Sequence, residues 1–171
     1  RLAAWWDGAG GHGVLMRHWL ALLLLGTAYA QGPTSTCVEV AGQGADADDR
    51  ARFRFHETMS FLTGDFHPAF WPWFVPQRYT TDPSDAAKEA ARAAAVPRID
   101  RVMTYLDGLI GDTDHVFENR RTVADAYAYV MARWTVRLDK SWRDYPNVAR
   151  FMTAMDADPS VQRVLKASAE G

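Results

Sequence analysis

The chain has 171 residues, enough for one domain with a sizeable core and short for two. Its 19 Lys and Arg against 21 Asp and Glu give a formal net charge of −2. This near-neutral balance lacks the positive charge with which proteins bind a phosphate backbone, so we predict no nucleic-acid partner. The single cysteine, Cys37, excludes an intramolecular disulfide and a cysteine-built zinc site.

Residues 1–47 follow neither a strand period nor a helical period, so we predict an irregular or poorly ordered N-terminal segment. Gly8, Gly10 and Gly13 have the spacing of a dinucleotide-binding loop. No apolar strand precedes them, however, and this absence favours a glycine-rich end over a nucleotide site.

The stretch 16–30 resembles a secretory signal, because Arg17 precedes an apolar run that ends in small residues. The run from Trp19 to Leu25 is too short for a membrane span, which needs about 20 apolar residues. Residues 1–15 precede the signal-like stretch, and a single cysteine fits a reducing compartment. We expect a cytoplasmic protein, with export through segment 16–30 as the alternative.

From about residue 48 the long segments share a helical period, in which apolar residues recur every three or four positions. We therefore predict an all-α fold, a bundle of about five helices over residues 48–171. The three apolar stripes are formed by Phe55, Met59, Leu62 and Phe66; by Ile99, Val102, Met103, Leu106 and Ile110; and by Val123, Ala126, Tyr127, Val130, Trp134 and Leu138.

Proline and glycine mark the expected ends of these helices. We expect Pro68, Pro72 and Pro76 to end the first helix and Gly111 to end the second. Two further short helices are predicted near 146–156 and 159–168, each with a proline in its first turn.

The alanine-rich stretch 85–95 has high helix propensity and few large apolar side chains, so it is expected to be a solvated helix. Pro97 follows it directly. A proline inside a helix removes one hydrogen bond and crowds the preceding turn, at a cost of about 3 kcal/mol. We therefore expect a kink or a break at Pro97.

Thr122 and Asp125 form a Thr-x-x-Asp box ahead of the third apolar stripe. A threonine at the N-cap accepts a hydrogen bond from the first turn, and an acidic residue three positions later reaches back to the N-cap N–H. The helix that begins here is predicted to be central and mostly buried. Replacing either residue by Ala should cost about 1 kcal/mol.

This box, in TVADAYAYVMARW, together with the later DYPNVARFM and DPSVQRVL, resembles the C-terminal helical domain of the glutathione S-transferase family. The resemblance extends from about Asp48 to Glu170, and RFHETMSFLTGDFHPAFWPWF is similar to the first helix of that domain in bacterial beta-class members. Two positions depart from the family pattern. Arg121 stands where an apolar residue is usual, and Glu118 stands where glycine is common.

The resemblance implies attack of glutathione, as co-substrate, on a hydrophobic electrophilic small molecule, without a permanently bound cofactor and with a possible homodimer. Family members bind glutathione on an N-terminal thioredoxin-like domain, whose βαβ pattern is not recognisable in residues 1–45. Cys37 lies too near the first helix to match the thiol-site cysteine of beta-class members. We therefore expect this chain by itself to be inactive in glutathione conjugation.

His67, in DFHPAF, matches the beta-class histidine that lies near the glutathione sulfur, so the resemblance implies a supporting catalytic role. An imidazole beside a thiol stabilises the thiolate. The opposing reading is an ordinary histidine at a helix end. Where beta-class members have Lys next, this chain has Pro68.

Five aromatic residues are candidates for the wall of an apolar substrate pocket, which needs bulk more than specific polar groups. They could equally be core residues. No metal site is predicted, because His56-Glu57 lacks the second histidine of a zinc-binding helix and the other histidines are scattered. The five aromatic candidates are Phe70, Trp71, Trp73, Phe74 and Trp134.

The leading hypothesis is a glutathione S-transferase-type protein whose helical domain supplies the acceptor pocket. The first alternative is a non-catalytic helical module for interaction or dimerisation. The second is a small exported helical protein.

Overall fold

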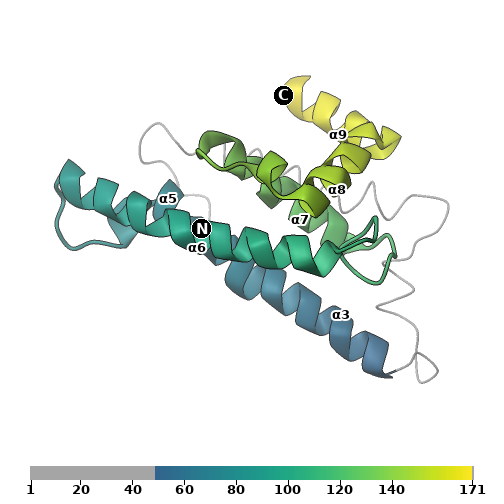
Figure 1. Cartoon of the computed structure of the whole chain (residues 1–171). Helices are drawn as coiled ribbons and strands as arrows, with labels where there is room; N and C mark the ends of the chain where they lie inside the picture. Colours follow the sequence, from purple (N-terminus) through teal and green to yellow (C-terminus); the bar gives the residue numbers. More distant parts are fainter. Residues whose placement is uncertain (1–48, 171) are drawn as a thin grey trace, which may run out of the picture.

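The computed structural model describes residues 49–170. The predictions for residues 1–47, among them the signal-like segment 16–30 and Cys37, lie outside the described residues. The described part consists of helices joined by turns, with one isolated bridge between Phe117 and Arg120 and no longer strand. The predicted all-α fold of about five helices is confirmed (Figure 1).

The first helical segment is α3 (Asp49–Phe61), which continues as the π-helix η2 (Leu62–Phe66) and the short helices α4 (His67–Ala69) and α5 (Trp71–Phe74). The expectation that Pro68 and Pro72 end this helix is wrong. Each proline lies within the first two positions of its short helix, where its missing N–H costs nothing. Helical structure ends only at Val75, ahead of Pro76 in the 3-10 turn η3 (Pro76–Arg78).

The longest helix, α6 (Asp85–Ile110), runs through Pro97 without a break, so the predicted break is wrong. The carbonyl group that loses its partner belongs to Ala93, four residues before Pro97, and Ala93 is exposed, so water can satisfy it. The alanine-rich first half is exposed along most of its length, as expected. Figure 1 shows α6 crossing the molecule, and η2, α4 and α5 pack against it.

Helix α7 (Val123–Arg133) continues as the 3-10 turn η4 (Trp134–Arg137) and lies at the centre of the domain. Eight of its 11 residues are buried, which confirms the predicted buried central helix. The capping box of Thr122 and Asp125 is formed. A helix that starts inside a core needs such a cap, because water cannot reach its first N–H groups.

The last two helices are α8 (Pro146–Ala157) and α9 (Pro159–Glu170), after the 3-10 turn η5 (Trp142–Asp144). They confirm the two predicted short helices. The carboxylate of Asp107, on α6, accepts the N–H groups of Asn147 at 2.8 Å and Val148 at 2.9 Å. The start of α8 is therefore capped by a residue of another helix.

The turn before α7 explains one departure from the family pattern. Glu118 and Asn119 have φ angles of 46° and 53°, and the Arg120 N–H donates to the Phe117 carbonyl at 2.8 Å. Positive φ at both central residues is the geometry of a type I′ turn, which favours glycine or asparagine. Glu118 is held there by an ion pair with Arg54 on α3.

Among the described helices, none combines the length and the apolar character that a membrane span requires.

Candidate functional site

His67 follows the π-helix η2 directly, at the start of α4. Its side chain is buried, with 7% of the residue exposed. A π-turn adds one residue to the helical turn and rotates every later side chain, and such turns are frequent at functional sites. The turn therefore sets which way His67 points, which the regular apolar stripe could not indicate.

His67 makes a polar contact with α7. Its Nδ1 atom lies 2.7 Å from the hydroxyl oxygen of Tyr127. Burial lowers the pKa of His67 and raises the pKa of Tyr127, because both charged forms lose hydration. Both side chains are therefore neutral near pH 7, and a permanent imidazolium is disfavoured.

Two indole rings enclose the imidazole. His67 stacks on Trp71, with centroids 5.3 Å apart and planes at 17°. Trp134, from η4, lies 5.4 Å from His67 on a tilted plane. The aromatic surroundings keep water from the imidazole, which is the cause of its lowered pKa.

Phe70 and Phe74 extend this aromatic cluster. Each packs edge-on against Trp134, at 5.3 Å and 5.2 Å, and the two phenyl rings stack at 6.2 Å. Phe70 and Trp134 are buried, whereas Trp71 and Phe74 are half-buried and keep part of their surface open. The structure thus brings together five of the six predicted site residues. The sixth, Trp73, is half-buried and packs against the same core.

Asp125 does more than the capping box requires. Its buried carboxylate accepts the Thr122 N–H at 2.6 Å and the Val116 N–H at 2.8 Å. The Nδ1 atom of His115 lies 3.5 Å from the same carboxylate, and the interaction with this carboxylate raises the pKa of His115. Asp125 therefore fixes the preceding loop to α7. Its role is structural, and it takes no part in the aromatic cluster.

Tyr127 belongs to the predicted apolar stripe, and no local pattern indicates its contact with His67, which lies 60 residues away in the sequence. A polar cluster beyond the site was not predicted either. The Tyr129 hydroxyl donates to Asp156 at 2.5 Å, and Arg133 donates to both. A tyrosine within an apolar stripe is the sequence signal that could have indicated such contacts, because a buried hydroxyl group needs a hydrogen-bond partner.

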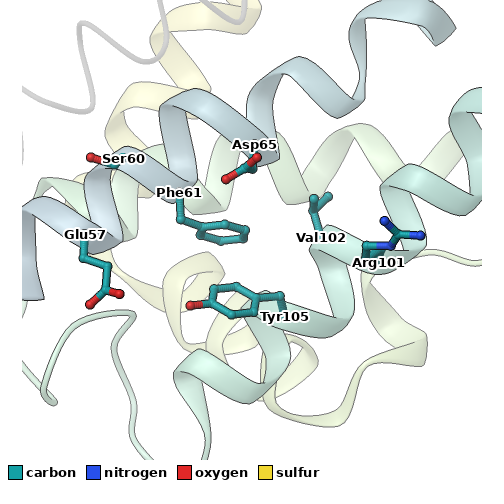
Figure 2. Close-up of a pocket in the computed structure, with 7 residues that line it drawn as sticks. All are labelled: Glu57, Ser60, Phe61, Asp65, Arg101, Val102 and Tyr105. Carbon is teal, nitrogen blue, oxygen red and sulfur yellow. The ribbon is translucent and has the colours of Figure 1, made fainter.

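A separate surface pocket of about 520 Å³ opens between α3, η2 and α6. Figure 2 shows the rings of Phe61 and Tyr105 next to each other at this pocket, and their centroids are 4.5 Å apart with the planes tilted by 55°. Glu57, Asp65 and Arg101 place both signs of charge around these rings. None of the predicted site residues lines this pocket.

Known proteins that are similar to this chain indicate the family to which it belongs. The model of the glutathione S-transferase C-terminal domain matches residues 62–159, which lie within the predicted segment 48–171. A glutathione S-transferase of Xanthomonas campestris pv. campestris, GST-4.5, is 30% identical over 128 residues, which cover 75% of this chain and 62% of the relative.

Two solved structures are similar. A bacterial beta-class glutathione S-transferase of Sphingomonas chungbukensis has 31% identity and a TM-score of 0.55, covering 69% of this chain and 54% of that one. A sphingomonad glutathione S-transferase complexed with glutathione has 30% identity and a TM-score of 0.64, covering 89% and 68%.

The chain therefore belongs to the glutathione S-transferase family and carries its C-terminal helical domain. It spans 62% of the length of the Xanthomonas relative and 58% of the length of glutathione S-transferase GstA of Escherichia coli O157:H7, which is 27% identical over 127 residues.

Proposed function

We propose that the described domain forms the acceptor side of a glutathione transferase site, with the aromatic cluster as its wall and His67 beside the reacting sulfur. The observation that carries this proposal is the contact of His67 with Trp71 and Trp134 in one aromatic cluster. Trp71 and Phe74 keep surface through which an apolar ligand can bind, and the buried rings behind them hold them in place.

The reaction is the attack of the glutathione thiolate on an electrophilic carbon. A carbon–sulfur bond forms, the leaving group departs with its electron pair, and the thiol proton passes to solvent. A neutral imidazole assists by donating an N–H hydrogen bond to the sulfur, which favours the thiolate form. The apolar wall positions the electrophile beside this sulfur.

The described residues 49–170 form helices and contain no βαβ unit. We propose that the groups binding the glutathione backbone belong to a thioredoxin-like domain and that this chain alone does not bind the tripeptide tightly. Isothermal titration of the chain with glutathione should then show no micromolar binding. Fusion of a relative's thioredoxin-like domain ahead of Asp49 should restore binding. Micromolar binding by the chain alone, abolished by His67→Ala, would contradict this division of the site.

The acceptor wall can be tested apart from glutathione. Tryptophan fluorescence should be quenched by a halogenated nitroarene, and Trp71→Ala and Phe74→Ala should each weaken this binding about tenfold. A tenfold change corresponds to about 1.4 kcal/mol, the size expected for the loss of one partly buried aromatic contact. Phe53→Ala is the matched control, because Phe53 is 70% exposed on α3. Equal affinity in all variants would place the acceptor elsewhere.

The dimerisation alternative is favoured by the surface of α3 and α6. Phe53, on α3, is 70% exposed, and Tyr105, which lines the pocket of Figure 2, is 52% exposed. We propose that this face binds a second copy of the chain. Sedimentation velocity should show a concentration-dependent dimer that Phe53→Ser and Tyr105→Ser weaken. Tyr79→Ser is the control, because Tyr79 is 49% exposed beyond α5. A monomer at all concentrations would exclude this face.

A further inference from the structure

His67 lies on α4 and Tyr127 lies on α7, 60 residues later in the sequence. The Nδ1 atom of His67 is 2.7 Å from the hydroxyl oxygen of Tyr127. The position of the hydrogen atom in this contact decides which nitrogen of His67 is a hydrogen-bond donor and which is an acceptor. A neutral imidazole carries one N–H, so the ring nitrogen that does not hold the proton is an acceptor. Either Tyr127 donates its proton to Nδ1, or His67 donates an Nδ1–H to Tyr127.

The hydroxyl proton separates the two arrangements. Within the described part of the chain, the Tyr127 hydroxyl has no hydrogen-bond partner other than His67. If His67 were the donor, the tyrosine proton would have no protein acceptor, and this arrangement would forgo one hydrogen bond. When Tyr127 donates, its proton and the Nδ1 lone pair are satisfied together.

Ionised forms do not provide a third arrangement. Burial lowers the pKa of His67 and raises the pKa of Tyr127, so neither an imidazolium nor a tyrosinate is favoured near pH 7. The other contacts of the imidazole described above are aromatic. Trp71 and Trp134 hold the ring plane, and the hydroxyl of Tyr127 adds a polar restraint on its rotation.

We propose that Tyr127 is a positioning residue that donates to Nδ1 of His67 and fixes the tautomer with its proton on Nε2. His67 then presents an N–H donor, not a lone pair, on its second nitrogen. An N–H donor is what a thiolate requires of a neutral imidazole. The catalytic role of this tautomer rests on the proposed function. The assignment of the tautomer does not depend on that function.

The test is NMR of the imidazole nitrogens in the whole chain, with His67→Gln to assign the signals. The wild-type protein should show an unprotonated Nδ1 and a protonated Nε2 on His67. In Tyr127→Phe, the pKa of His67 should rise by about 0.5 to 1, because a hydrogen bond that stabilises the neutral form is lost. The phenyl ring is kept, so the packing is preserved.

Tyr105→Phe is the matched control, since Tyr105 is half-exposed on α6, and it should leave the pKa of His67 unchanged. A proton on Nδ1 in the wild-type protein, or a fall or no change of the pKa in Tyr127→Phe, would overturn the assignment. The wild-type spectrum decides even if Tyr127→Phe does not fold. No glutathione is involved, so failure here is distinct from failure of the glutathione titration.

Discussion

The carboxylate of Asp125 accepts the backbone N–H of Val116, nine positions earlier in the chain, at 2.8 Å inside the core. The same carboxylate closes the capping box with Thr122. One buried side chain therefore fixes both the start of α7 and the loop that leads to it.

Asp125→Ala should destabilise the protein by about 2 to 4 kcal/mol, because two buried N–H groups lose their acceptor. Thr122→Ala should cost about 1 kcal/mol, the usual cost of losing an N-cap. The double variant should cost less than the sum, since both residues serve one motif. Urea denaturation of the three variants measures these values. Equal losses for the two single variants would show that the Val116 contact contributes nothing.

His115 should make part of the stability depend on pH. The nearby Asp125 carboxylate raises the pKa of His115 above its unfolded value of 6.5. The stabilisation is therefore fully present below pH 6.5 and is lost as the pH rises through the folded-state pKa. The free energy of unfolding should fall between pH 6 and pH 8.5 more in the wild-type protein than in His115→Gln.

The contribution of His67 to the pH dependence of stability has the opposite sign. Burial lowers the pKa of His67, so its contribution to stability is lost as the pH falls below 6.5. His67→Gln is therefore the control that removes this second contribution. A parallel pH dependence of the wild-type protein and His115→Gln would show that the His115 and Asp125 contact carries no charge.

Glu118→Gly should be more stable than Glu118→Ala by about 1 kcal/mol, because only glycine adopts the φ of 46° without strain. Both variants lose the ion pair with Arg54, so their comparison isolates the backbone. Thermal unfolding of the two proteins measures the difference. Identical midpoints would mean that the type I′ turn relaxes when the side chain is removed.

Asp107→Ala should cost about 2 kcal/mol through the start of α8, whose Asn147 and Val148 N–H groups lose their acceptor. Hydrogen exchange should become faster at these two amides and stay unchanged in α3. Asp112→Ala, an exposed aspartate just beyond α6, is the matched control. Unchanged exchange at Asn147 would show that water caps α8 equally well.

Local signals in the sequence determined the number and type of the helices. The spacing of apolar residues in the stripe of α7 repeats at the helical period, and the box of Thr122 and Asp125 lies within four residues. Both features depend on neighbours along the chain, so both were predictable. Family resemblance, carried by the same residues, indicated the domain.

Tertiary structure alone decided the features that join distant segments. Asp107 caps a helix 40 residues away, and Tyr127 meets His67 across 60 residues, which no local period records. Exposure decided that α6 could continue through Pro97, because water replaces the lost partner. The helical period of a sequence shows which residues share one face of a helix. The hydrogen-bond partner of a buried polar group on that face depends on which helix packs against it, and the period does not record this.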